Sequence, residues 1–232
     1  MTLQKKPLKT SIPPNIEEKP LRDNRRAGAL RDDRVTDCLL NGIRVGRRVY
    51  NRQGVMVLET PLKDELKHGW EVTWNDEGKL LLIEPYVNGK IHGTAKQYGR
   101  GGYVIGTYTF VHGTGFDVWR QENDDKTIFV SEIHSLRDGI PHGYEWHFTS
   151  PTQDLWHERT WYMGMLQGIE RSWNSKGRLR GGYPMFYVSN QGVSRQKYLK
   201  LARTDQTLPA YREEDDLPDR IFPAEIQDLM SS

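Results

Sequence analysis

The stretch HGWEVTWNDEG, residues 68–78, decides the fold. Trp70, Val72 and Trp74 alternate with Glu71 and Thr73, so large apolar side chains point to one side and polar side chains to the other. A side-chain period of two is typical of a half-buried β-strand. The sequence Asn-Asp-Glu-Gly then marks a turn, and the β-rich run 80–83 follows it. This stretch therefore predicts a β-hairpin.

Similar units recur about every two dozen residues between Asn41 and Val188, which is the signature of a repeat architecture. Each unit carries Gly-x-x-x-Gly, an aromatic residue about five positions later, and then a turn glycine. Six copies are recognisable, with the glycine pairs Gly42/Gly46, Gly89/Gly93, Gly139/Gly143 and Gly164/Gly168, and with Gly69 and Gly115 in two units that lack the first glycine at this spacing.

We predict that the aromatic residue of each unit packs in the core of the sheet. We expect these residues to stack as a ladder along one face of the sheet, because equivalent positions of successive hairpins share that face. Trp119 stands one position early in its unit. The ladder residues are Trp74, Tyr98, Trp119, Phe148 and Trp173.

Two segments resemble the MORN-repeat family, particularly its bacterial variant with the motif Asn-Gly-Lys-x-x-Gly. They are YVNGKIHG, residues 86–93, and RDGIPHGY, residues 137–144. The resemblance covers about two thirds of the chain and implies an open sheet of hairpins. It also implies a function of one of several kinds: a protein-interaction scaffold, a binder of acidic lipids, an appendage of an enzyme, or an antitoxin-like protein. Fold analogy does not choose among these.

The chain divides into three predicted segments. Residues 1–37 are basic and polar, and we expect them to be mostly disordered. Residues 38–190 form the repeat domain, an all-β, elongated antiparallel meander of about six hairpins. Residues 191–232 hold a short capping helix that begins after Ser194, a solvated acidic loop at 213–216 and a terminal helix at 224–230.

Composition narrows the partners. The net charge of +2 gives no pervasive basic excess, so nucleic acid is an unlikely partner. One cysteine, Cys38, cannot form an internal disulfide and suits a reducing compartment, and no apolar run is long enough to span a membrane. The start of the sequence lacks the apolar segment of a secretory signal. We therefore expect a cytoplasmic protein.

The position two residues after the second glycine is acidic in four of the six units, and this predicts an acidic stripe on the polar face. One interpretation is that each carboxylate pairs with a cross-strand Lys, Arg or Thr, as is common on sheets. The other is a groove for a basic or extended protein segment. The candidate partner-binding residues are Glu71, Asp117, Glu145, His147 and Glu170.

No catalytic constellation, cofactor motif or metal motif is evident. The turn histidines His68, His92 and His142 are two strands apart in successive hairpins, about 9.5 Å, which is too far to share one zinc ion. His142, His147 and His157 form the one plausible local group for metal or acid–base chemistry. The favoured function is a non-catalytic scaffold that binds a protein partner, and the alternative is peripheral binding to acidic membrane lipids.

Overall fold

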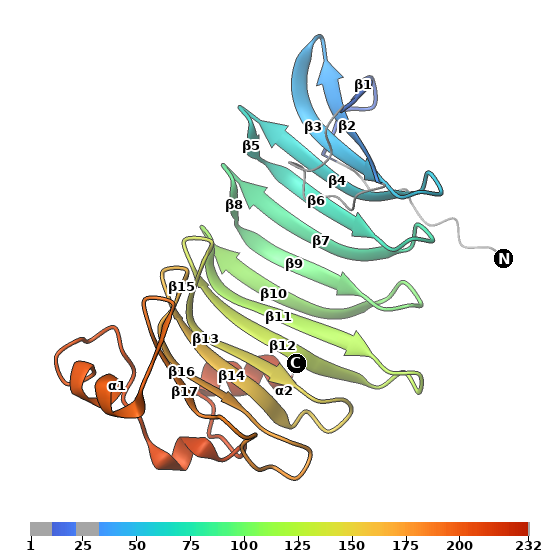
Figure 1. Cartoon of the computed structure of the whole chain (residues 1–232). Coiled ribbons are helices and arrows are strands. Elements are labelled where there is room, and N and C mark those ends of the chain that lie inside the picture. The colour runs from blue at the N-terminus through green and yellow to red at the C-terminus, as the bar shows by residue number, and fades with distance from the viewer. Residues whose placement is uncertain (1–10, 22–32, 232) are drawn as a thin grey trace. The chain divides into compact units, whose positions relative to one another are not determined.

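The computed structural model describes residues 11–21 and 33–231. In these residues the chain forms eighteen β-strands, two short α-helices and one 3₁₀-helix, and the strands make an open antiparallel sheet (Figure 1). The predicted all-β meander of hairpins with a helix near the C-terminus is confirmed. The chain divides into two compact units, Met1–Tyr103 and Val104–Ser232.

The first unit pairs each strand with the next along the chain through antiparallel hairpins, and the two-residue strands β5 and β8 lead into longer ones. Its strands are β1 (Glu17–Pro20), β2 (Arg34–Leu40), β3 (Ile43–Tyr50), β4 (Met56–Lys63), β5 (Leu66–Lys67), β6 (Gly69–Trp74), β7 (Leu80–Val87), β8 (Lys90–Ile91) and β9 (Gly93–Tyr98).

The second unit continues the same pattern and adds the helices. Its elements are β10 (Val104–Val111), β11 (Thr114–Glu122), β12 (Ile128–Arg137), β13 (Ile140–Phe148), β14 (Leu155–Tyr162), β15 (Met165–Leu166), β16 (Gly168–Ser172), β17 (Met185–Val188), β18 (Gln191–Val193), α1 (Arg195–Leu201), the 3₁₀-helix Glu213–Asp216 and α2 (Ala224–Ser231).

Two-residue turns in which both residues have positive φ join the hairpins at one end of the strands. This conformation is the type I′ turn, whose twist matches that of the flanking strands. In the unit around Gly115, the turn is His112-Gly113, so the turn glycine stands two residues before Gly115 instead of four, and the unit is contracted as its sequence indicates. The turns of the described chain are 41–42, 64–65, 88–89, 112–113, 138–139, 163–164 and 189–190.

Three of the loops at the other end of the strands are each held by an asparagine side chain, Asn51, Asn75 or Asn174. Asn75 Oδ1 accepts backbone N–H bonds from Glu77 and Lys79, at 3.0 and 2.9 Å, and Asn174 repeats the arrangement with Lys176 and Arg178. An Asn side chain that satisfies its own turn in this way fixes the loop without tertiary contacts. The glycine predicted to end each loop takes up the positive φ that the turn requires, as in Gly78 and Gly177.

Within the predicted N-terminal segment 1–37, the structure describes residues 11–21 and 33–37, and these include a strand that the sequence did not predict. Strand β1 pairs with β2, and β2 begins at Arg34. The Glu18 carboxylate accepts hydrogen bonds from Thr36, Arg48 and Tyr50, at 2.8, 2.7 and 2.9 Å. Burial would raise the pKa of Glu18, but these donors outweigh it and leave the pKa below its usual range. Predictions for residues 1–10 and 22–32 fall outside the described residues.

The C-terminal segment covers one face of the second unit. In Figure 1, α2 lies behind β12–β14. The Phe222 ring contacts Trp146 and Phe148, with ring centroids 5.4 and 5.9 Å apart. Arg220 Nη2 donates to the fully buried Glu158 carboxylate at 2.6 Å, and Arg120 Nη2 donates to the Leu229 carbonyl at 2.6 Å. These contacts bury apolar and charged groups together.

The acidic run 213–216 is solvated only at Glu213 and Glu214, and it is not a loop as the sequence predicted. It forms a 3₁₀-helix, and Asp216 pairs with the buried Arg171 at 3.1 Å. Helix α1 begins as predicted, since Ser194 caps it by accepting from Lys197 N–H. Tyr198 on α1 is fully buried against Ile169, Phe186 and Leu208.

Candidate functional site: a histidine–carboxylate cluster

On the face opposite the C-terminal segment, ionisable side chains of four neighbouring strands of the second unit lie together. Strands β11, β12, β13 and β14 lie side by side, and antiparallel pairing sets two rows of residues directly across them. Residues opposite each other in antiparallel strands point to the same face. The rows are Asp117–His134–Glu145–Arg159 and Glu132–His147–His157, and we call these seven residues the cluster.

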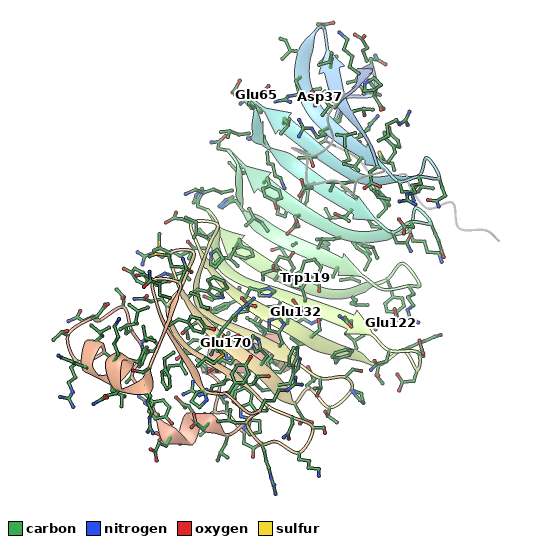
Figure 2. All side chains as sticks on the ribbon, in the orientation of Figure 1. Asp37, Glu65, Trp119, Glu122, Glu132 and Glu170 are labelled. Atoms are coloured by element: carbon green, nitrogen blue, oxygen red, sulfur yellow. The ribbon has the colours of Figure 1, made fainter. Side chains whose placement is uncertain are left out.

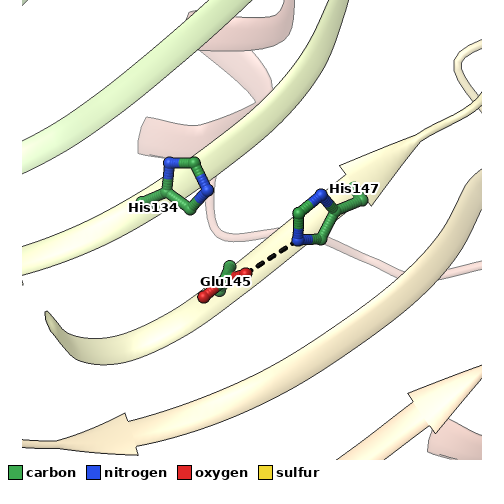
Figure 3. Close-up of side chains that lie close together, drawn as sticks. All are labelled: His134, Glu145 and His147. Carbon is green, nitrogen blue, oxygen red and sulfur yellow. Dashed lines mark hydrogen bonds and ion pairs between the residues drawn. The ribbon is translucent and has the colours of Figure 1, made fainter. Parts of the chain in front are cut away.

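Glu145 is the centre of the cluster. Its carboxylate accepts hydrogen bonds from His147 Nε2 at 2.7 Å, Arg159 Nη2 at 2.6 Å and Trp161 Nε1 at 2.7 Å, and its side chain is only 8% exposed (Figure 3). Burial raises the pKa of Glu145, but the three donors and the charge of Arg159 lower it by more. Its pKa therefore lies well below the usual range. Glu145 is therefore an ionised, fixed group.

His134 stands between two carboxylates. Its Nε2 lies 3.3 Å from Glu132 Oε2 and its Nδ1 lies 3.7 Å from Asp117 Oδ2. Burial lowers the pKa of His134, yet the interactions with Asp117 and the neighbouring carboxylates outweigh it and raise the pKa. Asp117 is itself held by Trp119, whose Nε1 donates to Oδ2 at 2.9 Å.

His157 continues the cluster toward β16. Its Nε2 lies 2.9 Å from Glu170 Oε1, and its ring centroid lies 5.3 Å from that of His147. Burial is the larger effect here and lowers the pKa of His157, despite the Glu170 carboxylate that opposes it. The three imidazole rings thus have different environments within one surface.

The carboxylates of the predicted acidic stripe are engaged by neighbouring side chains and do not form an open groove. Glu71, in the first unit, is buried and bonded to Thr60 and Lys67, both at 2.6 Å. Glu145 is likewise engaged by His147 and Arg159, and Glu170 by His157. These contacts favour the first interpretation, in which each carboxylate pairs with a neighbouring strand.

The predicted histidine group is also rearranged. His147 and His157 lie together, but His142 lies at the turn, where its Nδ1 accepts from Met163 N–H and its ring contacts Tyr162. His134 takes its place and was not among the predicted residues. The signal was the repeated spacing of a glutamate and a histidine two residues apart, at 132/134 and at 145/147.

The aromatic ladder is only partly as predicted. Phe148 and Trp173 are buried, Trp74 and Tyr98 are half-buried, and Trp119 is 37% exposed. On β11, Trp119 lies between the buried residues Val118 and Arg120 and points to the other face, so the structure does not place it in the ladder. Trp119 instead lies beside the cluster, and Figure 2 shows it with Glu132 and Glu170.

The cluster can exchange protons or hold a cation, since it combines neutral imidazole nitrogens with carboxylate oxygens. With neutral histidines, Asp117, Glu132 and Glu145 against Arg159 give the cluster a net charge of −2. No helix in the described part of the chain has the length and apolar character needed to cross a membrane. Comparisons with protein-family models and with curated proteins find no significant match to this chain.

Proposed function

We propose that this protein is a non-catalytic repeat scaffold that binds a protein partner through the cluster-bearing face of its second unit. The observation that carries the proposal is the exposed Trp119 beside a network of mutually bonded side chains. Tryptophan is enriched among residues that dominate protein–protein binding energy, and a surface whose side chains are already fixed loses little entropy on binding.

The charge of this face supports a partner with basic or extended character. Glu132 is 39% exposed and is the more accessible carboxylate of this face. Glu145 is only 8% exposed, and its carboxylate is engaged by three hydrogen-bond donors. A cationic side chain that approaches Trp119 would meet the indole ring and the Glu132 carboxylate together. The same negative charge disfavours contact with acidic lipid, so we propose a protein partner in preference to a membrane.

The test compares surfaces within one protein. Tagged full-length protein is cross-linked and purified from its native cell alongside Trp119→Ala and Glu132→Lys. The matched control is Trp70→Ala, because Trp70 is a similarly exposed tryptophan, 42%, in the first unit. Once the partner is identified, titration of each variant gives the affinity.

The proposal expects Trp119→Ala to weaken binding at least about 10-fold, as truncation of a central anchor typically costs about 2 kcal/mol or more. The control should bind like the parent. Equal loss in both tryptophan variants, or no loss in Trp119→Ala, would contradict the assignment of this face. Sedimentation with phosphatidylserine vesicles tests the lipid alternative, and vesicle binding that Trp119→Ala abolishes would replace the protein proposal.

A further inference from the structure

Three cluster residues meet the spatial requirement for a metal site. His134 on β12, and Glu145 and His147 on β13, each offer one ligand atom, and these atoms all lie within 4.8 Å of one another (Figure 3). Among the described residues, these three form the group of His, Cys, Asp or Glu side chains whose ligand atoms are close enough together to hold one metal ion. Strand pairing sets the positions, because His134 is directly opposite Glu145, and His147 follows Glu145 by two residues on the same face.

The donor set is characteristic of first-row transition metals. Two imidazoles and one carboxylate bind Zn²⁺ and its neighbours, with metal–ligand distances of about 2.0–2.2 Å. Neighbouring ligand atoms of such a site are about 3.3 Å apart, so side-chain rotations of an ångström or so would close the group. Glu132 is a further ligand within reach, since its oxygens lie 3.3 Å from His134 Nε2 and 3.9 Å from His147 Nδ1.

The surroundings resemble the outer shell that metal sites require. A metal-binding histidine usually gives its second ring N–H to a carboxylate, and His134 Nδ1 faces Asp117 Oδ2. Trp119 fixes Asp117, and Trp161 fixes Glu145 at the oxygen that His147 does not use. The second oxygen of Asp117 is buried and has no hydrogen-bond partner in the described structure, so this carboxylate has acceptor capacity to spare.

We propose that the protein binds one divalent first-row transition ion, with Zn²⁺ as the principal candidate, through His134, Glu145 and His147. The ion takes the place of the proton in the His147–Glu145 hydrogen bond, that proton moves to Nδ1 of the same imidazole, and Glu132 or water completes the coordination. Arg159, which is 34% exposed, turns toward solvent to remove its charge from the ion. Binding ties β12 to β13 and holds the face that carries Trp119 in one arrangement.

The test uses the full-length chain after removal of metals with a chelator. ZnCl₂ is titrated by calorimetry, and CoCl₂ is titrated by visible absorption, because a tetrahedral or five-coordinate site with imidazole ligands gives distinctive Co²⁺ bands. The solution is kept mildly alkaline, near pH 8, so that imidazoles are neutral. The proposal expects one equivalent bound, and NMR signals of the His134 and His147 rings that move on binding.

Variants separate this site from adventitious binding. His134→Ala and His147→Ala should each weaken Zn²⁺ binding at least about 10-fold, and Glu132→Gln less. The matched control, His142→Ala, removes a histidine of the same strand β13 outside the cluster and should bind like the parent. Parent protein that is folded by circular dichroism but binds no Zn²⁺, or His134→Ala that binds with parental affinity, would overturn the proposal. If an alanine variant fails to fold, the ring signals of the parent decide, and unmoved His134 and His147 signals at saturation would refute the site.

Discussion

Replacement of Trp173 by alanine tests the packing of the second unit. Trp173 is 1% exposed, and its indole N–H donates to the Asp216 carbonyl at 2.7 Å. Truncation of a buried aromatic residue removes its transfer free energy and leaves a cavity, which together cost about 3–5 kcal/mol. A domain of this size loses about 2–4 °C of melting temperature per kcal/mol, so we expect a fall of about 6–20 °C.

The assay is unfolding by heat, for the melting temperature, and by urea, for the free energy of unfolding, both followed by circular dichroism, with Trp119→Ala as the matched control. Trp119 is an exposed tryptophan of the same unit, and its truncation should cost no more than about 1 kcal/mol. Trp173→Phe keeps an apolar ring but loses the donor to Asp216, so it should fall between parent and alanine. A loss below about 1 kcal/mol for Trp173→Ala would show that the described packing of this residue is wrong.

Three further outcomes are expected. Glu18→Gln should destabilise the first unit at neutral pH, and the difference from the parent should shrink as pH falls below about 4.3, because a lowered folded-state pKa gives stability that protonation removes; a pH-independent difference would contradict the contacts of Glu18. Gly168→Ala should destabilise more than Gly139→Ala in thermal melts, since an added methyl at Gly168 collides with Thr160 whereas at Gly139 it meets open space. Cys38 is buried, which raises its pKa to about 11, so a thiol reagent at pH about 8 should modify it only on unfolding, and rapid reaction of the folded protein would refute its burial.

The hairpins could be predicted because their determinants are local. Alternating side chains and turn glycines specify a strand and its turn without help from distant residues, and the positive φ at Gly89 and Gly139 is a requirement that the sequence states directly. The turn at 64–65 was harder, since Asp64 and Glu65 adopt the same backbone without any glycine.

The cluster could not be predicted because it depends on register. The turn at 138–139 pairs Leu136 with Pro141, but an irregularity then shifts the pairing so that His134 faces Glu145. Sequence alternation places each residue on a face but does not reveal a bulge. For the same reason the sequence suggests that Glu145 is an exposed carboxylate. In the structure it is buried beside Arg159, so the substitution Glu145→Lys would place a second buried cation there.

The contacts between the C-terminal segment and the sheet could not be predicted from the sequence either. Arg220 reaches Glu158 across 62 positions of chain, and no local pattern links the two residues. Polar content predicted a solvated segment at 213–216, but Asp216 is engaged because Arg171 is buried beneath it and needs a counter-charge. Strand β1 was missed similarly, since Glu18 is ordered by donors on β2 and β3 rather than by its own apolar residues.

Residues 11–12 and the C-terminal segment both pack over strands of the sheet, and this has a consequence for synthesis on the ribosome. Ser11 and Ile12, which contact β6 and β3, are made before the strands of the first unit. Phe222 is made 74 residues after Phe148, which at about 5–20 residues per second is a delay of about 4–15 s. During that interval the nascent second unit exposes Trp146 and Phe148, so we expect cellular chaperones to engage this protein while its last strands emerge.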